Sequence, residues 1–367
     1  MLLPWDVMTG GRIELIELEG TPREMGRAFG EQCRMDIEGL YGVRVENAIT
    51  QALNYGQRSV DEAGLHRVAA RCLQKLQGWR PWILEELKGI AEGARRTTEE
   101  IWTMNALTDL RDLVAFGDGA WTRAASDEGC TALLADRSEA GGRTLVGQTW
   151  DLASDNLPFL RVVMRQPLDG AWTKSLTLVG CLTLLGVNEV GIAVGTTNIR
   201  ATDNRIGVGY LDVLHAALAE TSCERAVQVV ETAPRAAAHF YWVADRNRVV
   251  AVECSATRCV RREVDGAYVH TNHMTESELE HLEVQGTPMA SSYARHARMW
   301  ELVAEASRPL EPSWLKRALA DTENGELAID RRDFAGISTN AGLVVRPGEP
   351  DMWVVHGPAS RGCWFEF

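Results

Sequence analysis

The chain has 367 residues, of which 45% are hydrophobic, and this is enough to bury a large core. Its formal net charge is −13, and its 38 Lys and Arg residues are scattered along the sequence instead of forming a basic stripe. Nucleic acids and anionic membranes are therefore poor candidates as partners, and small molecules or peptides are better ones.

The ends and the cysteines of the chain predict its compartment. No apolar run approaches the roughly 18 residues that a bilayer span needs, and residues 1–6 have neither a basic n-region nor an apolar h-region. Most of the eight cysteines fall in apolar, periodic segments, which suits reduced core thiols better than a disulfide framework. We expect a cytoplasmic protein without a cofactor.

The N-terminal part predicts a strand followed by a capped helix. Residues 13–18 alternate in part, as a half-buried strand does. Thr21 is a good N-cap, Pro22 suits the first helical position and Glu24 completes a capping box. One face of this helix carries apolar residues at steps of four, namely Met25, Phe29 and Cys33.

Residues 61–115 predict three further helices, the second opened by Pro81 and the third capped by Thr97 with Glu100 three residues on. From 117 to 129 the composition turns to Gly, Asp, Ser and Ala without periodicity, which indicates a mobile, exposed linker. An outer helical layer would thus end at residue 129.

The remainder alternates between blocks of strands and blocks of helices. A hairpin follows the linker, from an apolar run after Gly129 through a Gly-rich turn to a second strand that ends on Asp151. Two helices are expected at about 209–220, and at 222–233 with Thr221 as its cap; 275–320 is expected to be helical and 336–367 to be strand. The other expected strands are 161–166, 174–179, 182–187, 189–195, 239–244, 248–254, 257–264 and 267–271. Such blocks are typical of α+β layers.

The Gly129-Cys130 step carries the first chemical signal. Gly129 lacks a Cβ, so its peptide can be approached closely by the neighbouring thiol. Attack of Cys130 on the Gly129 carbonyl would shift the acyl group from nitrogen to sulfur, and water would then split the chain. The new α-amine of Cys130, with an ordinary pKa of about 7.7–8.0, can then act as a base for its own thiol.

Three features resemble the isopenicillin N acyltransferase family of N-terminal-nucleophile hydrolases. They are the Gly-Cys-Thr junction, the hairpin to Gly-Gln-Thr-Trp-Asp at 147–151 and the Gly-Thr-Pro-x-Glu-Met-Gly string from Gly20. The resemblance implies a four-layer αββα sandwich and self-cleavage before Cys130. We therefore expect 1–367 to be a single domain, made of a largely helical chain 1–129 and a second chain 130–367.

The resemblance also implies the residues of the site. The carboxylate of the family's Gln-x-Trp-Asp motif corresponds to Asp151, which would lie beside the nucleophile; the usual asparagine of that motif is Thr149 here. Asn272, in His-Thr-Asn-His, would donate to the oxyanion, a contribution of roughly 2.7–4 kcal/mol in other enzymes. His270 and His273, together with two upstream cysteines at 254 and 259, lack the spacing of metal ligands, so we predict no metal.

A third segment, Ser291-Ser292-Tyr293-Ala294-Arg295, resembles the family's Ser-x-x-Arg segment. Its arginine would meet an acyl or carboxylate oxygen, and Arg295 matches best, with Arg298 as the alternative. Thr131, Ser292 and Arg295 are the expected substrate-binding residues. His356, near the C-terminus, is expected to be structural.

The sequence thus predicts an enzyme that forms an acyl-thioester on Cys130 from an amide or thioester donor and passes the acyl group to water or an amine. Two alternatives remain open. One is an uncut thiol hydrolase in which His270 or His273 serves Cys130 as base. The other is a binding or scaffold protein of the same fold that never cleaves.

Overall fold

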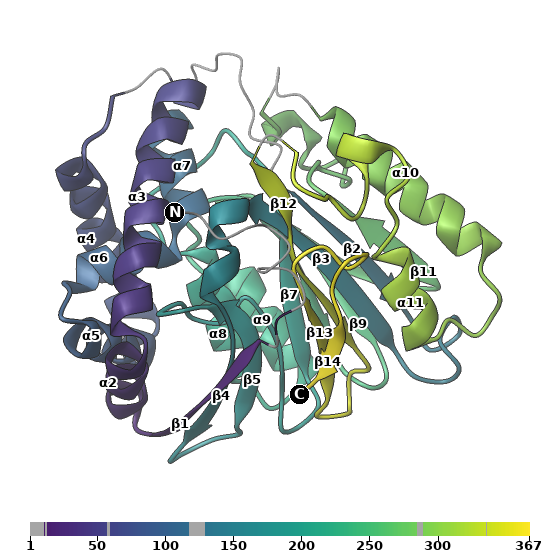
Figure 1. The fold of residues 1–367 in the computed structure, drawn as a ribbon, viewed down its shortest axis with the longest axis horizontal. Helices are drawn as coiled ribbons and strands as arrows, with labels where there is room; N and C mark the ends of the chain where they lie inside the picture. Colours follow the sequence, from purple (N-terminus) through teal and green to yellow (C-terminus); the bar gives the residue numbers. More distant parts are fainter. Residues whose placement is uncertain (1–10, 12, 57–58, 117–128, 285–288, 335) are drawn as a thin grey trace.

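Two β-sheets face each other and carry helices on their outer sides, which gives the four-layer αββα arrangement of Figure 1. The computed structural model describes residues 11, 13–56, 59–116, 129–284, 289–334 and 336–367. Of the predicted linker at 117–129, residues 117–128 lie outside the described residues, and Gly129 is the first residue of β2 (Gly129–Ala135). The predicted α+β sandwich is therefore confirmed in its layers.

The first sheet has eight strands, and β1 pairs with β4 in parallel whereas the other neighbours are antiparallel. In spatial order they are β1 (Glu14–Gly20), β4 (Leu160–Pro167), β5 (Thr173–Leu178), β6 (Leu185–Asn188), β7 (Ala193–Asn198), β8 (His239–Ala244), β9 (Val249–Cys254) and β10 (Cys259–Glu263).

The second sheet has six strands, all paired antiparallel. They run in the order β11 (Ala267–His270), β2 (Gly129–Ala135), β3 (Leu145–Ala153), β12 (Ile337–Val345), β13 (Met352–His356) and β14 (Trp364–Glu366). Polar side chains bridge the two sheets; for example, Trp242 Nε1 of β8 donates to Gln148 Oε1 of β3 at 2.7 Å.

The outer layers differ in size. The first sheet is covered by helices from the N-terminal part and by α8 (Tyr210–Leu218) and α9 (Cys223–Thr232), and the second sheet by α10 (Ala290–Glu305) and α11 (Pro312–Ala318). The N-terminal helices are α2 (Pro22–Gln32), α3 (Arg34–Gly56), α4 (Glu62–Trp79), α5 (Pro81–Ala94), α6 (Thr98–Asn105) and α7 (Leu107–Phe116). Short 3₁₀ turns lie at η1 (Ser154–Phe159), η2 (Glu280–Leu282) and η3 (Gly325–Leu327). Among the described residues, none of the helices combines the length and apolarity of a membrane span.

Most predicted elements are present, with local differences. The capping boxes at Thr21 and Thr97 are both formed. The three helices predicted over 61–115 are four, because the third ends at Asn105 with Ala106 as its C-cap, and α7 begins at Leu107. The cap of α9 is Ser222 and not Thr221. The region 275–320 is helical mainly in α10 and α11, and β7 starts later than predicted because Gly191 turns the chain with φ +83°.

Four glycines explain how α2 and α5 cross. A Cβ on Gly26 would lie 2.1 Å from the backbone oxygen of Glu86, and one on Gly30 would lie 2.3 Å from that of Ile90. Gly89 and Gly93 of α5 make equivalent approaches to the backbone of α2, at 2.2 Å each. The two helices therefore touch backbone to backbone, and this contact gives Gly26 and Gly30 of the N-terminal motif a packing role.

We expect Gly89→Ala to destabilise the protein by at least about 1–3 kcal/mol, because the new methyl meets backbone atoms that cannot rotate away. Gly78→Ala in α4 is the matched control: its Cβ meets nothing within 4 Å, so the change should stabilise by about 0.5–1 kcal/mol. Urea unfolding of the full chain measures both. A Gly89→Ala midpoint at or above that of wild type would contradict the crossing.

Candidate active site

Strand β2 carries the predicted nucleophile between the two sheets. All seven of its residues are buried, because the strand is covered on both faces. Cys130 and Ala132 pack in the core between the sheets, whereas Leu133 packs under α10 and α11. Since side chains alternate along a strand, Cys130 points between the sheets and Thr131 points toward α10.

The backbone around Cys130 is held by two of the predicted residues. The Cys130 N–H donates to Asn272 Oδ1 at 2.8 Å. Arg295 of α10 donates through Nη1 to the Cys130 carbonyl and, at 3.1 Å, to the Thr131 hydroxyl, and through Nη2 to Asn272 Oδ1 at 2.8 Å. The planar guanidinium therefore connects the nucleophile strand to the segment that carries Asn272.

Gly129 is required by the space around these contacts. A Cβ built on Gly129 would lie 2.6 Å from Arg295 Nη2 and 2.9 Å from Asn272 Oδ1. The side chains that approach Gly129 closely are thus Arg295 and Asn272, which also hold Cys130. Any larger residue at 129 would push Arg295 and Asn272 away from the peptide.

Asp151 lies directly across the hairpin from this peptide. In the β2–β3 pairing Gly129 is opposite Asp151, and Cys130 is opposite Trp150. Asp151 Oδ1 accepts from the Thr339 hydroxyl at 2.7 Å, and Oδ2 lies 3.9 Å from Arg331 Nε. Oδ2 has no hydrogen-bond partner among the described residues although it is buried.

The electrostatics of the two acids follow from burial. Burial raises the pKa of the Cys130 thiol to about 12; the Asp151 carboxylate acts in the same direction, and the Arg295 guanidinium opposes it. Burial also raises the pKa of Asp151, against Arg331, Arg295 and the hydrogen bond from Thr339. In the uncut chain the thiol is therefore protonated near neutral pH, and a chemical step needs a base beside it.

Asn272 is oriented by its partners. Its Nδ2 donates to Asn198 O at 2.8 Å, while its oxygen takes the two donors described above. A flipped amide would set NH₂ against two donors and the oxygen against a carbonyl, so the orientation is well determined. The backbone N–H of Asn198 also forms a hydrogen bond to the Cys130 thiol, which lowers the pKa of that thiol. The Asp151 backbone N–H acts on the thiol in the same way, and Asn272 Nδ2 lies next to Asn198 at the end of β7.

The serines before Arg295 support the site from behind. Ser291 Oγ accepts from Arg295 Nε at 3.1 Å and also from Arg331. Ser292 Oγ accepts from the Asn272 N–H at 2.8 Å and contacts His273 Nδ1 at 2.7 Å. Both are buried at the start of α10, so this helix positions Arg295 and Asn272 together. Thr149 Oγ1, where the family pattern has asparagine, accepts from the Thr131 N–H at 3.1 Å.

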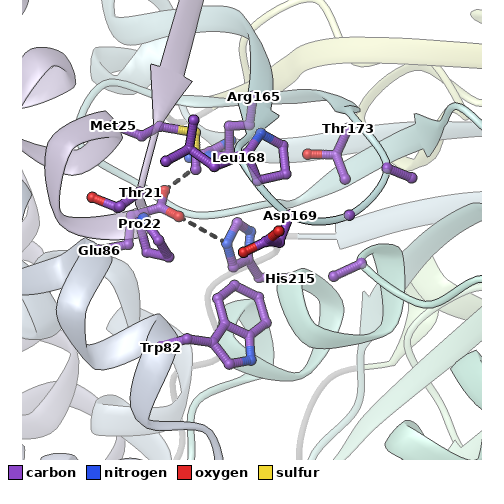
Figure 2. A pocket seen from close by; sticks show the side chains of 14 residues that line it. Thr21, Pro22, Met25, Trp82, Glu86, Arg165, Leu168, Asp169, Thr173 and His215 are labelled. Carbon is purple, nitrogen blue, oxygen red and sulfur yellow. Dashed lines mark hydrogen bonds and ion pairs between the residues drawn. The ribbon is translucent and has the colours of Figure 1, made fainter.

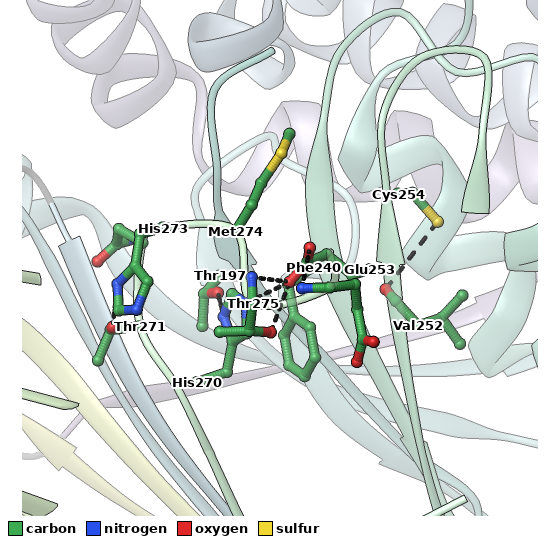
Figure 3. A network of polar contacts seen from close by, with 12 residues as sticks. Thr197, Phe240, Val252, Glu253, Cys254, His270, Thr271, His273, Met274 and Thr275 are labelled. Carbon is green, nitrogen blue, oxygen red and sulfur yellow. Dashed lines mark hydrogen bonds and ion pairs between the residues drawn. The ribbon is translucent and has the colours of Figure 1, made fainter. Parts of the chain in front are cut away.

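Neither predicted histidine forms a hydrogen bond with Cys130 among the described residues. His270 contacts Thr197 through Nδ1 at 2.7 Å and Glu253 through Nε2 at 3.1 Å, as the network in Figure 3 indicates. Burial lowers the pKa of His273 to about 3. His, Cys, Asp and Glu side chains of the described chain form no group of three arranged as metal ligands. His356 Nε2 contacts the Leu157 carbonyl at 3.0 Å.

Several cavities lined by the described residues lie outside the cluster around Cys130. One of about 390 Å³ opens between the start of α2, α5 and α8, and Figure 2 shows the ion pair of Glu86 with Arg165 and His215 in its wall. None of the predicted site residues lines it. Another, of about 240 Å³, is lined in part by residues 330–334, which include Arg331, so it adjoins the residues that hold Asp151.

Sequence reasoning missed three residues that contact this cluster, namely Asn198, Arg331 and Thr339. Arg331 is only 2% exposed, yet it stands within Asp330-Arg331-Arg332-Asp333, a run that indicates a solvated loop. Asn198 ends a strand, and Thr339 looks like any threonine of a buried strand. A signal for Thr339 exists only in the pairing, where it lies opposite Asp151.

Comparison with known proteins gives the family. The family model described as acyl-coenzyme A:6-aminopenicillanic acid acyl-transferase matches residues 138–346, more than half of the chain, and this range includes Asp151, Asn272 and Arg295. The chain is 26% identical over 336 residues to the acyl-coenzyme A:6-aminopenicillanic-acid-acyltransferase 40 kDa form of Emericella nidulans, covering 89% of this chain and 87% of that protein.

The matches among solved structures are more distant in sequence. A Caenorhabditis elegans N-acylethanolamine-hydrolyzing acid amidase ortholog gives a TM-score of 0.44 at 15% identity, covering 60% of this chain and 94% of that one. Penicillin V acylase from Agrobacterium tumefaciens gives 0.39 at 12% identity, covering 62% and 83%. By the match of the family model over residues 138–346, the chain belongs to the acyl-coenzyme A:6-aminopenicillanic acid acyltransferase family, as the sequence motifs predict.

Proposed function

We propose that this chain is a self-cleaving N-terminal-cysteine amidohydrolase or acyltransferase that forms an acyl-thioester on Cys130. The observation that carries the proposal is the set of contacts around one peptide. Asn272 and Arg295 hold the Cys130 nitrogen and carbonyl, and the buried Asp151 lies opposite Gly129. Family membership supports chemistry on acyl groups.

In the proposed activation step, the Cys130 sulfur attacks the carbonyl carbon of Gly129. The carbon–nitrogen bond breaks, the acyl group passes to sulfur, and the nitrogen leaves as an amine after taking a proton. Asp151 is the ionisable group available to take the thiol proton, since Oδ2 has no hydrogen-bond partner among the described residues and burial raises its pKa toward that of the thiol. Water then hydrolyses the thioester and releases chains 1–129 and 130–367.

In the mature enzyme the α-amine of Cys130 is the base for its own thiol, and Asp151 holds that amine. The thiolate attacks an amide or thioester, and the leaving amine or thiol departs with a proton. Asn198 N–H lies beside the sulfur and would stabilise the oxyanion; Asn272 Nδ2 would join it by exchanging its bond to Asn198 O for one to the substrate. Arg295 and Thr131 keep the nucleophile strand in place, and the acyl group leaves to water or to an amine.

Small amides, peptides and acyl-thioesters are the substrate classes that suit this chemistry. The name of the fungal relative pairs an acyl-coenzyme A donor with an amine acceptor, and we carry this pairing over as a proposal. Hydrolysis of a small amide is the default outcome because water is always present. The cavity beside Arg331 is the proposed opening toward Asp151.

The uncut thiol hydrolase is disfavoured by the histidine contacts. His270 uses both ring nitrogens on Thr197 and Glu253, and His273 is turned toward Ser292. To act as the base for the Cys130 thiol, either histidine would have to break one of these buried contacts.

The test is the intact mass of freshly purified wild-type protein under denaturing conditions, with Cys130→Ala beside it. We expect two wild-type fragments that meet at Gly129/Cys130, and one uncut species of 40.5 kDa for the variant, which also lacks amidase activity. Active but uncut wild-type protein would overturn self-activation and favour an internal thiol. Uncut and inactive protein would favour a binding protein.

A further inference from the structure

Two cysteines outside the candidate active site face each other across a tight hairpin. Cys254 ends β9 and Cys259 begins β10, and the two residues are register partners in the antiparallel pair. Their sulfur atoms are 2.7 Å apart, although both are free thiols here. Cys254 is buried, whereas Cys259 is partly exposed.

The turn between them is held in one conformation. The Ser255 N–H donates to the Arg258 carbonyl at 2.9 Å, which closes the turn. Asp203 accepts from the Ser255 hydroxyl at 2.7 Å and from the Thr257 N–H at 3.2 Å. A rigid turn keeps the two thiols together, so joining them costs little further conformational entropy.

The register also favours a covalent bond. Opposite residues in an antiparallel pair alternate between hydrogen-bonded and non-hydrogen-bonded. Because Ser255 and Arg258 close the turn with a hydrogen bond, the next pair, Cys254 and Cys259, is a non-hydrogen-bonded one. In such pairs the Cα atoms lie about 4.5 Å apart, which is inside the 4.4–6.8 Å range of disulfides.

A buried cation lies beside the thiols. Arg235 is 3% exposed and donates to three backbone carbonyls, those of Ser255, Val230 and Glu231. Among the described residues it forms no ion pair with a carboxylate. Burial lowers the pKa of Arg235. Neighbouring groups raise this pKa by more than burial lowers it, and Cys254 contributes most, followed by Cys259. The charge of Arg235 thus favours a thiolate at this hairpin.

The two thiols differ in their surroundings. The hydrogen bond with Cys254 lowers the pKa of Cys259, and Arg235 adds to this against burial. Burial raises the pKa of Cys254 well above its usual value. Cys259 is therefore both the more acidic and the more accessible thiol, and it is suited to react first with a reagent from solvent.

We propose that Cys254 and Cys259 are a dithiol–disulfide redox pair that exchanges with low-molecular-weight disulfides. The Cys259 thiolate attacks one sulfur of the small disulfide, whose S–S bond breaks and releases one thiol that takes the Cys259 proton. Cys254 then attacks Cys259 Sγ, loses its own proton and releases the second thiol. The protein loses two electrons and two protons, and the small disulfide becomes two thiols.

The pair is separate from the candidate active site. Glu253, the neighbour of Cys254, points to the other face of β9, where it accepts from the Thr275 N–H at 2.9 Å and contacts His270 (Figure 3). Its side chain points away from that of Cys254 in the same view. Oxidation of Cys254 and Cys259 can therefore be tested independently of the self-cleaving mechanism.

Trypsin offers a direct readout, because Arg258 lies between the two cysteines. Cleavage after Arg248, Arg258 and Arg261 places Cys254 and Cys259 on different peptides, which only a disulfide holds together. Reduced full-length protein is incubated with oxidised and reduced glutathione at graded ratios, alkylated and digested. We expect the linked pair to rise with the proportion of oxidised glutathione and to vanish after dithiothreitol. Thiols titrated in denaturant should fall by two from eight.

Single variants test the order of attack. Cys254→Ser should accumulate glutathione on Cys259. In Cys259→Ser, glutathione should be added to Cys254 at least about tenfold more slowly than it is added to Cys259 in Cys254→Ser. Cys363→Ser, which removes an exposed cysteine elsewhere, is the matched control and should leave the linked pair unchanged. The absence of linked peptides from native wild-type protein in oxidised glutathione would overturn the proposal, whatever the variants do. Glutathione on Cys254 but not on Cys259 would overturn the assigned order.

Discussion

Asp151→Asn is expected to leave the full-length chain uncut, with self-cleavage slowed at least about 10²-fold. Asparagine keeps the shape of the side chain but cannot take a proton or hold an ammonium group. Asp151 lies opposite Gly129, and its carboxylate raises the pKa of the Cys130 thiol, so the two groups interact directly. The measurement is the rate of conversion to two fragments, followed by mass under denaturing conditions.

The control for this variant is Asp212→Asn, a second buried aspartate that lies outside the site. Asp212 Oδ2 accepts from both Trp102 Nε1 and the Gly209 N–H, so an amide oxygen can take over both bonds. We expect Asp212→Asn to be cut at the wild-type rate. Equal rates for Asp151→Asn and wild type would contradict the role of Asp151 in proton transfer.

The pH dependence gives a graded form of the same test. Self-cleavage needs ionised Asp151, so its rate should fall as pH drops through the pKa of that carboxyl, which burial raises above its usual value. The hydrogen bond from Thr339 stabilises the ionised form and lowers this pKa. Removing the hydroxyl in Thr339→Val raises the pKa further, and the acid limb of the rate profile should move to higher pH. A merely structural threonine would leave the limb in place.

The features of the site that depend on residues close together in the chain could be predicted from the sequence. A glycine, a cysteine and an apolar run predict the strand, and the hairpin returns Asp151 to the position opposite Gly129, as the pairing shows. The capping box at Thr21 is equally local, since its two bonds join residues three apart. Such features depend on neighbours in the chain, which a sequence displays directly.

The remaining contacts depend on distant segments. Arg331 is buried only because the chain from α11 to β12 packs it against Ser291 and Asp151, and its charged neighbours in sequence indicate the opposite. Gly26 and Gly89 are required by a helix crossing between segments about 60 residues apart. The hydrogen bond from Asn272 Nδ2 to the Asn198 carbonyl also depends on the tertiary structure, because Asn198 ends β7 of the first sheet and Asn272 lies in the loop after β11 of the second.

Arg295→Lys should slow self-cleavage by roughly 10–150-fold, because one hydrogen bond to a charged group contributes about 1.5–3 kcal/mol and each 1.36 kcal/mol is a factor of ten. The guanidinium of Arg295 reaches the Cys130 carbonyl, Asn272 Oδ1 and Ser291 Oγ from one plane. The single ammonium of lysine keeps the charge but cannot span all three.

Arg298 provides the matched comparison, since it stands one helical turn further along α10 and was the alternative on sequence grounds. Its partners are Asp321, Glu301 and Glu323, and Asp321 lies at 2.9 Å from Nη2. Arg298→Lys should therefore leave the cleavage rate within about twofold of wild type, because its partly exposed ion pairs do not include a residue of the candidate active site. If instead Arg298→Lys were the slower variant, the arginine that serves the nucleophile would have to be reassigned. If both variants cleaved at the wild-type rate, the guanidinium of Arg295 would only stabilise the fold around β2. It would then have no role in positioning the peptide bond that is cleaved.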